Sequence, residues 1–176
     1  MRSPLKRQDF AYQLPDDLIA SQPLDNRTDS RLMVIHPGQP FAHRQVSDLP
    51  SFIRAGDVVV ANNTRVFPAR LFGAKASGGR IEVMIERLLS EHAVRAFVKA
   101  SKSPKDGAVL HMDGGFELTI TGRDGDLFLL ESDPSLRILE MAEAHGHIPL
   151  PPYIKRDDTA SDRERYQTVF AKDSGA

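Results

Sequence analysis

The feature that most constrains the fold is a run of short alternating segments between residues 66 and 130. Apolar and polar side chains alternate along residues 80–89 and 92–100, and turns containing glycine or proline separate most of the segments. Alternation with period two is typical of strands with one buried face, and several short strands at such spacing favour a small barrel or sandwich. The candidate strands are residues 66–72, 80–89, 92–100, 109–112, 116–120 and 127–131. The sequence therefore predicts an all-β module of six strands.

The segment before this module has a mixed pattern of short helices and strands. Pro15 is placed to begin a short helix over residues 16–22, and a second short helix is expected from Ser47 or Asp48. Residues 31–36 and 41–46 flank a Pro-Gly turn and predict a hairpin. Residues 57–61, DVVVA, have three consecutive valines without alternation, which predicts a strand covered on both faces.

The segment after the module also mixes helices with extended chain. A helix is expected with Ser132 or Asp133 as its cap and Pro134 in its first turn, and it should end at Gly146. The three prolines of residues 147–156 favour an extended chain. Ser161 and Glu164 have capping-box spacing for a last short helix. We therefore predict an incomplete α/β domain, formed by residues 1–65 and 145–176, that is interrupted by a closed six-stranded β-barrel. The barrel insert and its following helix span residues 66–144.

Composition excludes several kinds of chemistry. The chain has no cysteine, which excludes disulfides, thiolate catalysis and cysteine-based metal sites. No apolar run approaches the roughly 18 residues of a membrane span, and no secretory signal is visible, so a cytoplasmic protein is expected. Residues 62–110 carry nine basic and four acidic side chains, whereas residues 111–144 carry two basic and eight acidic. The cationic stretch can meet a polyanion, or the two stretches can solvate each other's faces.

Two loops carry candidate binding residues. Asn62, Asn63, Thr64 and Arg65 follow the predicted valine strand, where loops of α/β sheets collect ligands, although an Asx turn explains these residues equally well. A second loop at a strand end holds Lys99, Lys102, Ser103 and Lys105. These side chains suit phosphate contacts, and a polar hairpin loop is the structural alternative. His145 and His147 lack a third ligand nearby, so no metal site is predicted.

Several stretches together resemble one enzyme family. The most specific of them are NNTRVFPARL at residues 62–71 and HIPLPPYI at residues 147–154. In these stretches the chain is similar to the N-terminal part of the S-adenosylmethionine:tRNA ribosyltransferase-isomerases of queuosine biosynthesis. Members of that family continue beyond the SGA sequence at residues 174–176, so the resemblance implies a chain truncated after Ala176.

The resemblance implies an activity and a set of roles. S-adenosylmethionine would donate its ribosyl part to a 7-aminomethyl-7-deazaguanine base in the tRNA anticodon, forming epoxyqueuosine and releasing adenine and methionine. No metal is implied, and the full-length form is expected to be a monomer. Arg65 or Arg70 would bind the methionine carboxylate, and the lysine loop would bind phosphates of the anticodon arm. The general base stays unassigned. The alternative is a non-catalytic RNA- or nucleotide-binding fragment.

Overall fold

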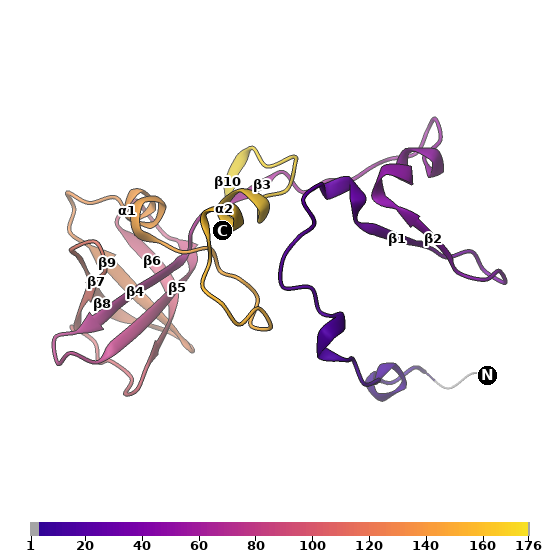
Figure 1. Ribbon diagram of the computed structural model, residues 1–176. Coiled ribbons are helices and arrows are strands. Elements are labelled where there is room, and N and C mark those ends of the chain that lie inside the picture. The colour runs from indigo at the N-terminus through magenta and orange to yellow at the C-terminus, as the bar shows by residue number, and fades with distance from the viewer. Residues whose placement is uncertain (1–3, 176) are drawn as a thin grey trace. The chain divides into compact units, whose positions relative to one another are not determined.

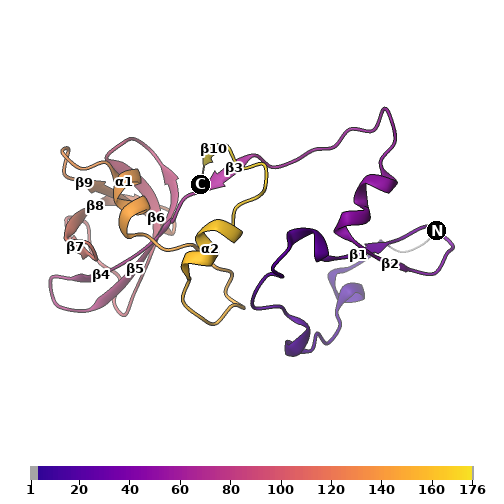
Figure 2. The same ribbon diagram turned by 45° about the horizontal axis from the view of Figure 1, so that its top comes forward.

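The structure is a computed structural model that describes residues 4–175 (Figures 1 and 2). Its internal contacts divide the chain into two units, one ending at Val59 and the other beginning at Val60. Each unit is described by itself. The sequence predicted a different division, with residues 1–65 and 145–176 in one domain and residues 66–144 in the other. That division stays a prediction.

The first unit contains the predicted hairpin. Strand β1 (Arg31–Val34) pairs antiparallel with β2 (Ala42–Gln45), and Met33 lies opposite His43. Gly38, in the connecting turn, has a φ of 73° that other residues rarely adopt. The hairpin prediction is confirmed, with strands slightly shorter than expected.

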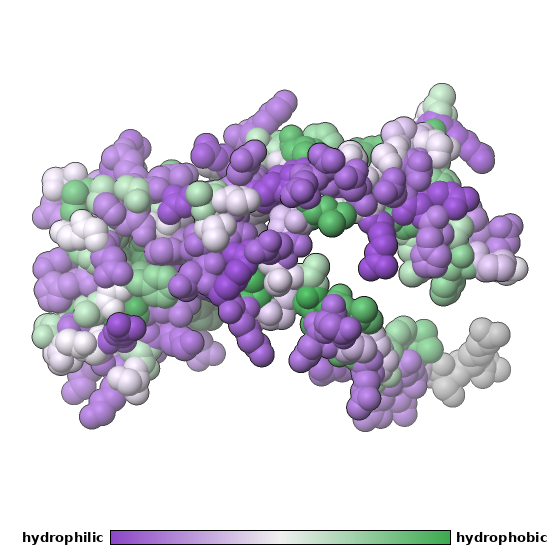
Figure 3. All heavy atoms as spheres, in the orientation of Figure 1, coloured by the Kyte–Doolittle hydropathy of each residue, from purple (hydrophilic) through white to green (hydrophobic). Residues whose placement is uncertain are grey.

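The helices of this unit are single 3₁₀ segments rather than α-helices. They span Arg7–Phe10, Asp16–Leu18, Arg27–Asp29 and Val46–Phe52. The helix expected over residues 16–22 is thus only three residues long. Short helices depend on packing for their stability, and none of residues 4–59 is buried. Hydrophobic atoms accordingly appear at the surface in Figure 3, and Phe10, Leu18 and Phe41 are among the exposed side chains.

The strand predicted for residues 57–61 is not formed. This segment has no regular secondary structure, and Val58 and Val60 are 87% and 91% exposed. A strand is stabilised by hydrogen bonds to a neighbour, and within residues 4–175 no segment pairs with this one. The three valines therefore give this segment a high strand preference, but residues 4–175 contain no strand that pairs with it.

The second unit contains the predicted closed barrel of six antiparallel strands, seen at the left of Figure 1. Its spatial order is β4-β5-β6-β9-β8-β7, with β7 pairing back onto β4. The six-stranded prediction is confirmed, because each barrel strand overlaps one of the candidate segments. The strands are β4 (Arg70–Lys75), β5 (Arg80–Leu88), β6 (Ala93–Ala100), β7 (Val109–Met112), β8 (Phe116–Asp124) and β9 (Leu127–Ser132).

The barrel interior is filled by the inward half of the alternating pattern. Ile81, Val83 and Ile85 of β5 are all buried, and the other strands contribute their own alternate residues. At the closing pair, a Cβ on Gly73 would collide with the backbone carbonyl of His111. Glycine is therefore needed for β4 and β7 to approach closely enough to close the barrel.

The first predicted strand of the module is interrupted near Pro68. Residues 64–66 form β3 (Thr64–Val66), which pairs in parallel with β10 (Asp173–Gly175) rather than with the barrel. The side-chain amide of Gln167 extends this pairing, since Val66 N–H donates to its Oε1 at 2.8 Å and its Nε2 donates to the Val66 carbonyl at 2.7 Å. The chain thus enters the barrel and returns from it along adjacent strands.

Two α-helices follow the barrel, and both begin at other residues than predicted. Helix α1 (Ile138–His145) buries Ile138 and Ala142 in the barrel core. It starts beyond Pro134 because the Asp133 side chain accepts hydrogen bonds from Ser135 and holds a turn there.

Helix α2 (Ala160–Arg165) is capped by Thr159 with Asp162, two residues earlier than the expected pair. In the described part of the chain, no helix has the length and apolarity needed to cross a bilayer.

Candidate functional site

The C-terminal arm, residues 146–175, is joined to the barrel at Arg70 and His147. The two residues exchange backbone hydrogen bonds, with His147 N–H donating at 2.8 Å and Arg70 N–H at 3.2 Å. Gly146 ends α1 just before this contact, and a Cβ there would collide with the Pro68 carbonyl. The close approach enabled by glycine places His147 beside the first barrel strand.

A buried carboxylate holds the His147 ring. Asp158 Oδ1 lies 2.6 Å from His147 Nδ1, and Asp158 Oδ2 accepts the Ile148 N–H at 3.0 Å. The Asp158 side chain is only 7% exposed, whereas that of His147 is 40% exposed. The ring also meets Phe72 edge to face, with 5.0 Å between centroids. The imidazole is therefore fixed on one side and open on the other.

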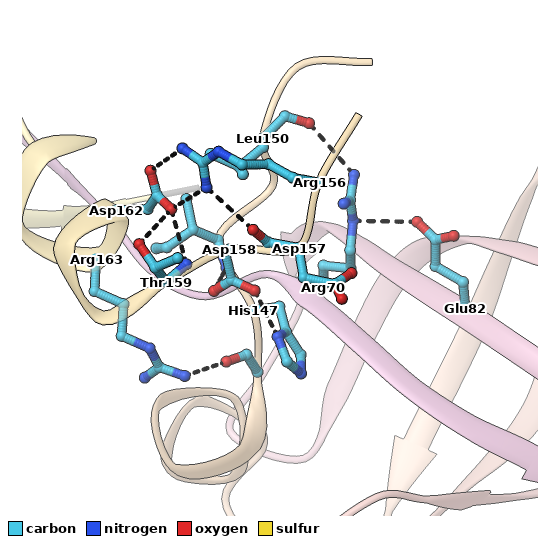
Figure 4. A network of polar contacts seen from close by, with 12 residues as sticks. Arg70, Glu82, His147, Leu150, Arg156, Asp157, Asp158, Thr159, Asp162 and Arg163 are labelled. Carbon is cyan, nitrogen blue, oxygen red and sulfur yellow. Dashed lines mark hydrogen bonds and ion pairs between the residues drawn. The ribbon is translucent and has the colours of Figure 1, made fainter. Parts of the chain in front are cut away.

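A second carboxylate, Asp162, orders the arm next to this pair (Figure 4). It accepts two hydrogen bonds from the Arg156 guanidinium, at 2.6 and 2.9 Å, and two more from the backbone and hydroxyl of Thr159 at 2.8 Å. These donors, the guanidinium first among them, hold the pKa of Asp162 well below its usual range. Arg163 then donates to the Gly146 carbonyl at 2.6 Å, which ties α2 to the end of α1.

Arg70 is engaged within the same network. Its Nε lies 3.1 Å from Glu82 Oε1, and its Nη2 is 3.5 Å from the Leu150 carbonyl oxygen. Figure 4 shows the guanidinium between the barrel strand that carries Glu82 and the arm. Arg70 thus links the barrel to the arm in this structure, a role that the sequence does not reveal.

An open cavity of about 1010 Å³ lies where the arm meets strands β4, β5 and β6. Its size is at the upper end of the range typical of small-molecule sites. Phe72 and Ile81 supply apolar surface, and charged or titratable side chains surround them. These side chains are Arg80, Glu82, Lys99, Asp113, His147 and Asp157.

The predicted loop at residues 62–65 lies outside this cavity. Thr64 N–H donates to Asn62 Oδ1 at 2.9 Å, so the Asx turn that was one of the two interpretations is present. Asn63 Nδ2 donates to Asp173 at 2.6 Å, which fixes the loop to the strand pair β3–β10. The side chain of Arg65 is exposed, and it makes no hydrogen bond or ion pair with residues 4–175.

The predicted lysine loop lies at the end of β6, and its four candidate residues are brought together in part. Lys99 lines the cavity, whereas Lys102, Ser103 and Lys105 are exposed on the loop beyond it. Pro104, between them, is buried and anchors the loop.

Two cations that the sequence analysis missed also reach this loop. Lys75 Nζ donates to the Lys102 carbonyl at 3.1 Å, and Arg123 donates to Ser103 Oγ at 2.5 Å. The Arg123 guanidinium also stacks 3.8 Å from the centroid of Phe128. Strand pairing in the barrel brings Lys75 and Arg123 to this loop, although both are distant from it in sequence. Predicting these contacts would therefore have required the strand order.

The two neighbouring histidines do not share a site. His145 is exposed and lies against the Phe116 ring, while His147 faces Asp158. Across the described residues, no group of three or more possible metal ligands is found. Asp158 was also missed from the sequence, because it lies in an irregular segment 11 residues after His147.

Comparison with known proteins identifies relatives along nearly the whole chain. Residues 7–176 match a family model described as "Queuosine biosynthesis protein". Two proteins named S-adenosylmethionine:tRNA ribosyltransferase-isomerase, from Xanthomonas euvesicatoria pv. vesicatoria and Xanthomonas oryzae pv. oryzae, are 50% and 49% identical over 173 residues. These matches cover 98% of this chain and 49% of each relative.

A solved structure is also similar in sequence. It is the crystal structure of S-adenosylmethionine tRNA ribosyltransferase from Thermotoga maritima, with 30% identity and a TM-score of 0.40. The match covers 79% of this chain and 48% of that one. The chain therefore spans about half the length of the curated relatives it matches.

Proposed function

Because the chain belongs to the queuosine biosynthesis protein family, we propose that it is part of an S-adenosylmethionine:tRNA ribosyltransferase-isomerase. The observation that carries the proposal is the 50% identity, over 98% of the chain, to a relative with that name. The reaction would move the ribosyl part of S-adenosylmethionine onto the aminomethyl group of a 7-deazaguanine base in the tRNA anticodon. Epoxyqueuosine would form there, with release of adenine and methionine. We expect such a protein to act in the cytoplasm and as a monomer.

The lysine loop is proposed to bind the tRNA. Lys102 and Lys105 are exposed, and Lys75 and Arg123 reach the same loop by hydrogen bonds to Lys102 and Ser103. Cations gathered on one surface attract phosphates regardless of sequence, which suits the backbone of an anticodon arm. Lys99 lies in the adjoining cavity, so it would contact the part of the RNA nearest the reacting base.

The loop at residues 62–65 is proposed to bind S-adenosylmethionine. Arg65 is exposed, so its planar guanidinium is available for the methionine carboxylate. Asn62 and Thr64 form the turn that presents Arg65, and Asn63 ties that turn to Asp173. Arg70 is the weaker of the two candidate cations, because its ion pair with Glu82 would have to be exchanged for the substrate.

A non-catalytic RNA-binding fragment is the second candidate. It is supported by the closed barrel with its cationic loop and by the half-length coverage of the relatives. We expect the 176-residue chain by itself to bind tRNA without completing the reaction.

Two measurements distinguish these functions. Purified chain and the full-length Xanthomonas euvesicatoria relative would each be mixed with labelled tRNA for a binding titration, and with S-adenosylmethionine plus tRNA for adenine release. We expect both proteins to bind tRNA and only the longer one to release adenine. Absence of tRNA-dependent adenine release from the relative would refute the family reaction. Robust release by the chain alone would refute the expectation that it is incomplete.

A further inference from the structure

One imidazole in the structure is oriented in the way that acid–base catalysis requires. His147 lines the cavity with a side chain that is 40% exposed, while the carboxylate behind it is 7% exposed. Ring orientation by a buried carboxylate is the arrangement by which proteins fix the tautomer of a histidine that exchanges protons. A purely structural ion pair would not need the imidazole to face the cavity.

The hydrogen bonds of Asp158 determine which ring nitrogen is basic. Its two oxygens face Nδ1 of His147 and the N–H of Ile148, so the carboxylate acts as an acceptor at both positions. An ionised carboxylate has no proton to donate, and Nδ1 must therefore carry the hydrogen. In the neutral ring the lone pair then lies on Nε2, which has no hydrogen-bond partner among the described residues.

The backbone around His147 is held as firmly as the ring. His147 exchanges two hydrogen bonds with Arg70, and its ring packs against Phe72. Arg163, donating to the Gly146 carbonyl, fixes the preceding residue. A base that is already positioned needs no reorganisation when the substrate binds.

We propose that His147 is the general base of the reaction and that Asp158 is its positioning residue. The inference rests on the proposed function, which supplies a sulfonium substrate; with its methionine carboxylate on Arg65 outside the cavity, its ribosyl part would have to enter the cavity beside His147. Nε2 takes the proton from the ribose carbon bonded to sulfur, the C–H electron pair stays on that carbon, and the adjacent sulfonium stabilises it. The imidazole becomes an imidazolium facing the Asp158 carboxylate, so charge is conserved in the step.

Other charged groups around the ring shape its environment. Glu82 and Asp113 are acidic members of the cavity wall, Arg80 and Lys99 are basic members, and Arg70 pairs with Glu82 beside it. On the arm, Asp157 lines the cavity and Asp158 touches the ring itself. Asp158 is the only one of these groups hydrogen-bonded to the imidazole, so its removal should act directly on the orientation of the His147 ring.

The test uses the full-length Xanthomonas euvesicatoria relative, with substitutions at the positions that align with His147, Asp158 and His145. His147→Gln should lower tRNA-dependent adenine release by roughly 10²- to 10⁴-fold, the usual contribution of a general base. It should also abolish exchange of the sulfonium-adjacent hydrogens with deuterated solvent. Binding of tRNA and of S-adenosylmethionine should change little. His145→Gln, which alters an exposed ring outside the cavity, is the matched control.

Two further readouts separate catalysis from a structural role. Asp158→Asn should lower kcat and the rate of solvent-deuterium exchange together, while the KM values for tRNA and S-adenosylmethionine stay nearly unchanged. Unchanged turnover in His147→Gln, or an exchange rate that does not fall in Asp158→Asn, would overturn the proposal while leaving the family reaction intact. If His147→Gln does not fold, the exchange rate in Asp158→Asn still decides. An unmodified relative that releases no adenine would instead refute the proposed function.

Discussion

Replacing Asp162 by Asn should destabilise the second unit, because this carboxylate joins the start of α2 to Arg156. Asp162 is buried and accepts four hydrogen bonds, two from Arg156 and two from Thr159. Asparagine has nearly the same shape but no charge, and one of its two side-chain positions donates instead of accepting. The variant therefore keeps a helix cap and loses the ion pair.

The size of the effect follows from these contacts. Removing one partner of a fully buried ion pair costs about 3–5 kcal/mol. Here the Arg156 side chain is 25% exposed and also donates to the Asp157 carbonyl at 3.0 Å, so water and this remaining contact still solvate the guanidinium in the variant. The remaining amide oxygen can still accept the Thr159 N–H, which preserves most of the roughly 1 kcal/mol of a helix cap. We expect Asp162→Asn to lower the free energy of unfolding by about 2 kcal/mol at neutral pH.

Urea unfolding of the 176-residue chain, followed by circular dichroism, measures this difference as a function of pH. The folded-state pKa of Asp162 lies below its unfolded value. Its contribution is therefore present above the unfolded pKa of about 3.9 and is lost as pH falls below it. The difference between the two proteins should be constant from neutral pH to about pH 5 and should shrink below about pH 4.

Asp126→Asn is the matched control, because that carboxylate is exposed in a turn of the barrel. It should change stability by no more than about 0.5 kcal/mol. An Asp162→Asn effect as small as that of the control would refute the argument. So would a difference between wild type and variant that persists unchanged into the acid range.

Three further predictions concern binding and the strand pair. Lys102→Ala and Lys105→Ala in the full-length relative, at the aligned positions, should each weaken tRNA binding and reduce the salt slope by roughly one unit without affecting S-adenosylmethionine binding. An unchanged slope in both would assign the loop a purely structural role. Arg65→Ala should lower turnover while the melting temperature stays the same, and Arg65→Lys should not restore full activity because it lacks the bidentate fork. A strong loss of stability would instead assign Arg65 a structural role. Gln167→Ala leaves two half-buried backbone groups of Val66 unpaired and should cost about 1–3 kcal/mol in urea unfolding, whereas Gln167→Glu should restore only the contact to the N–H.

The barrel strands could be predicted because the alternation that marks each of them is a local feature of the sequence. Alternation along β5 and β8 specifies which residues face inward, and Ile81, Val83 and Ile85 are buried as the pattern requires. Closure of the barrel is harder to predict from the sequence, since it depends on the close approach of Gly73 to β7. The valine segment at residues 57–61 failed as a strand prediction for the opposite reason. Its composition reports strand preference, but hydrogen-bond pairing depends on a neighbour that the pattern cannot supply.

The candidate site was predicted only in part. Lysines near one strand end are adjacent in sequence, so Lys99 and Lys102 could be identified together, whereas Lys75 reaches the same loop only through the barrel. His147 attracted attention only as half of a weak histidine pair. Its partner Asp158 lies just after the proline-rich segment, in irregular chain where no pattern relates side chains to one another. Contacts formed by irregular chain become visible only in three dimensions.

The pairing of β3 with β10 has a consequence for how this protein can vary. Asn63 and Asp173 are 110 residues apart, yet they are hydrogen-bonded beside the strand pair. The chain between them, which includes the barrel, is therefore an insertion whose two ends are held side by side. Lengthening a barrel hairpin leaves the register of that pair untouched, so the barrel loops can diversify at little cost to the rest of the protein. The same geometry makes the pair a late event in folding, because so long a loop must be closed before its few hydrogen bonds can form.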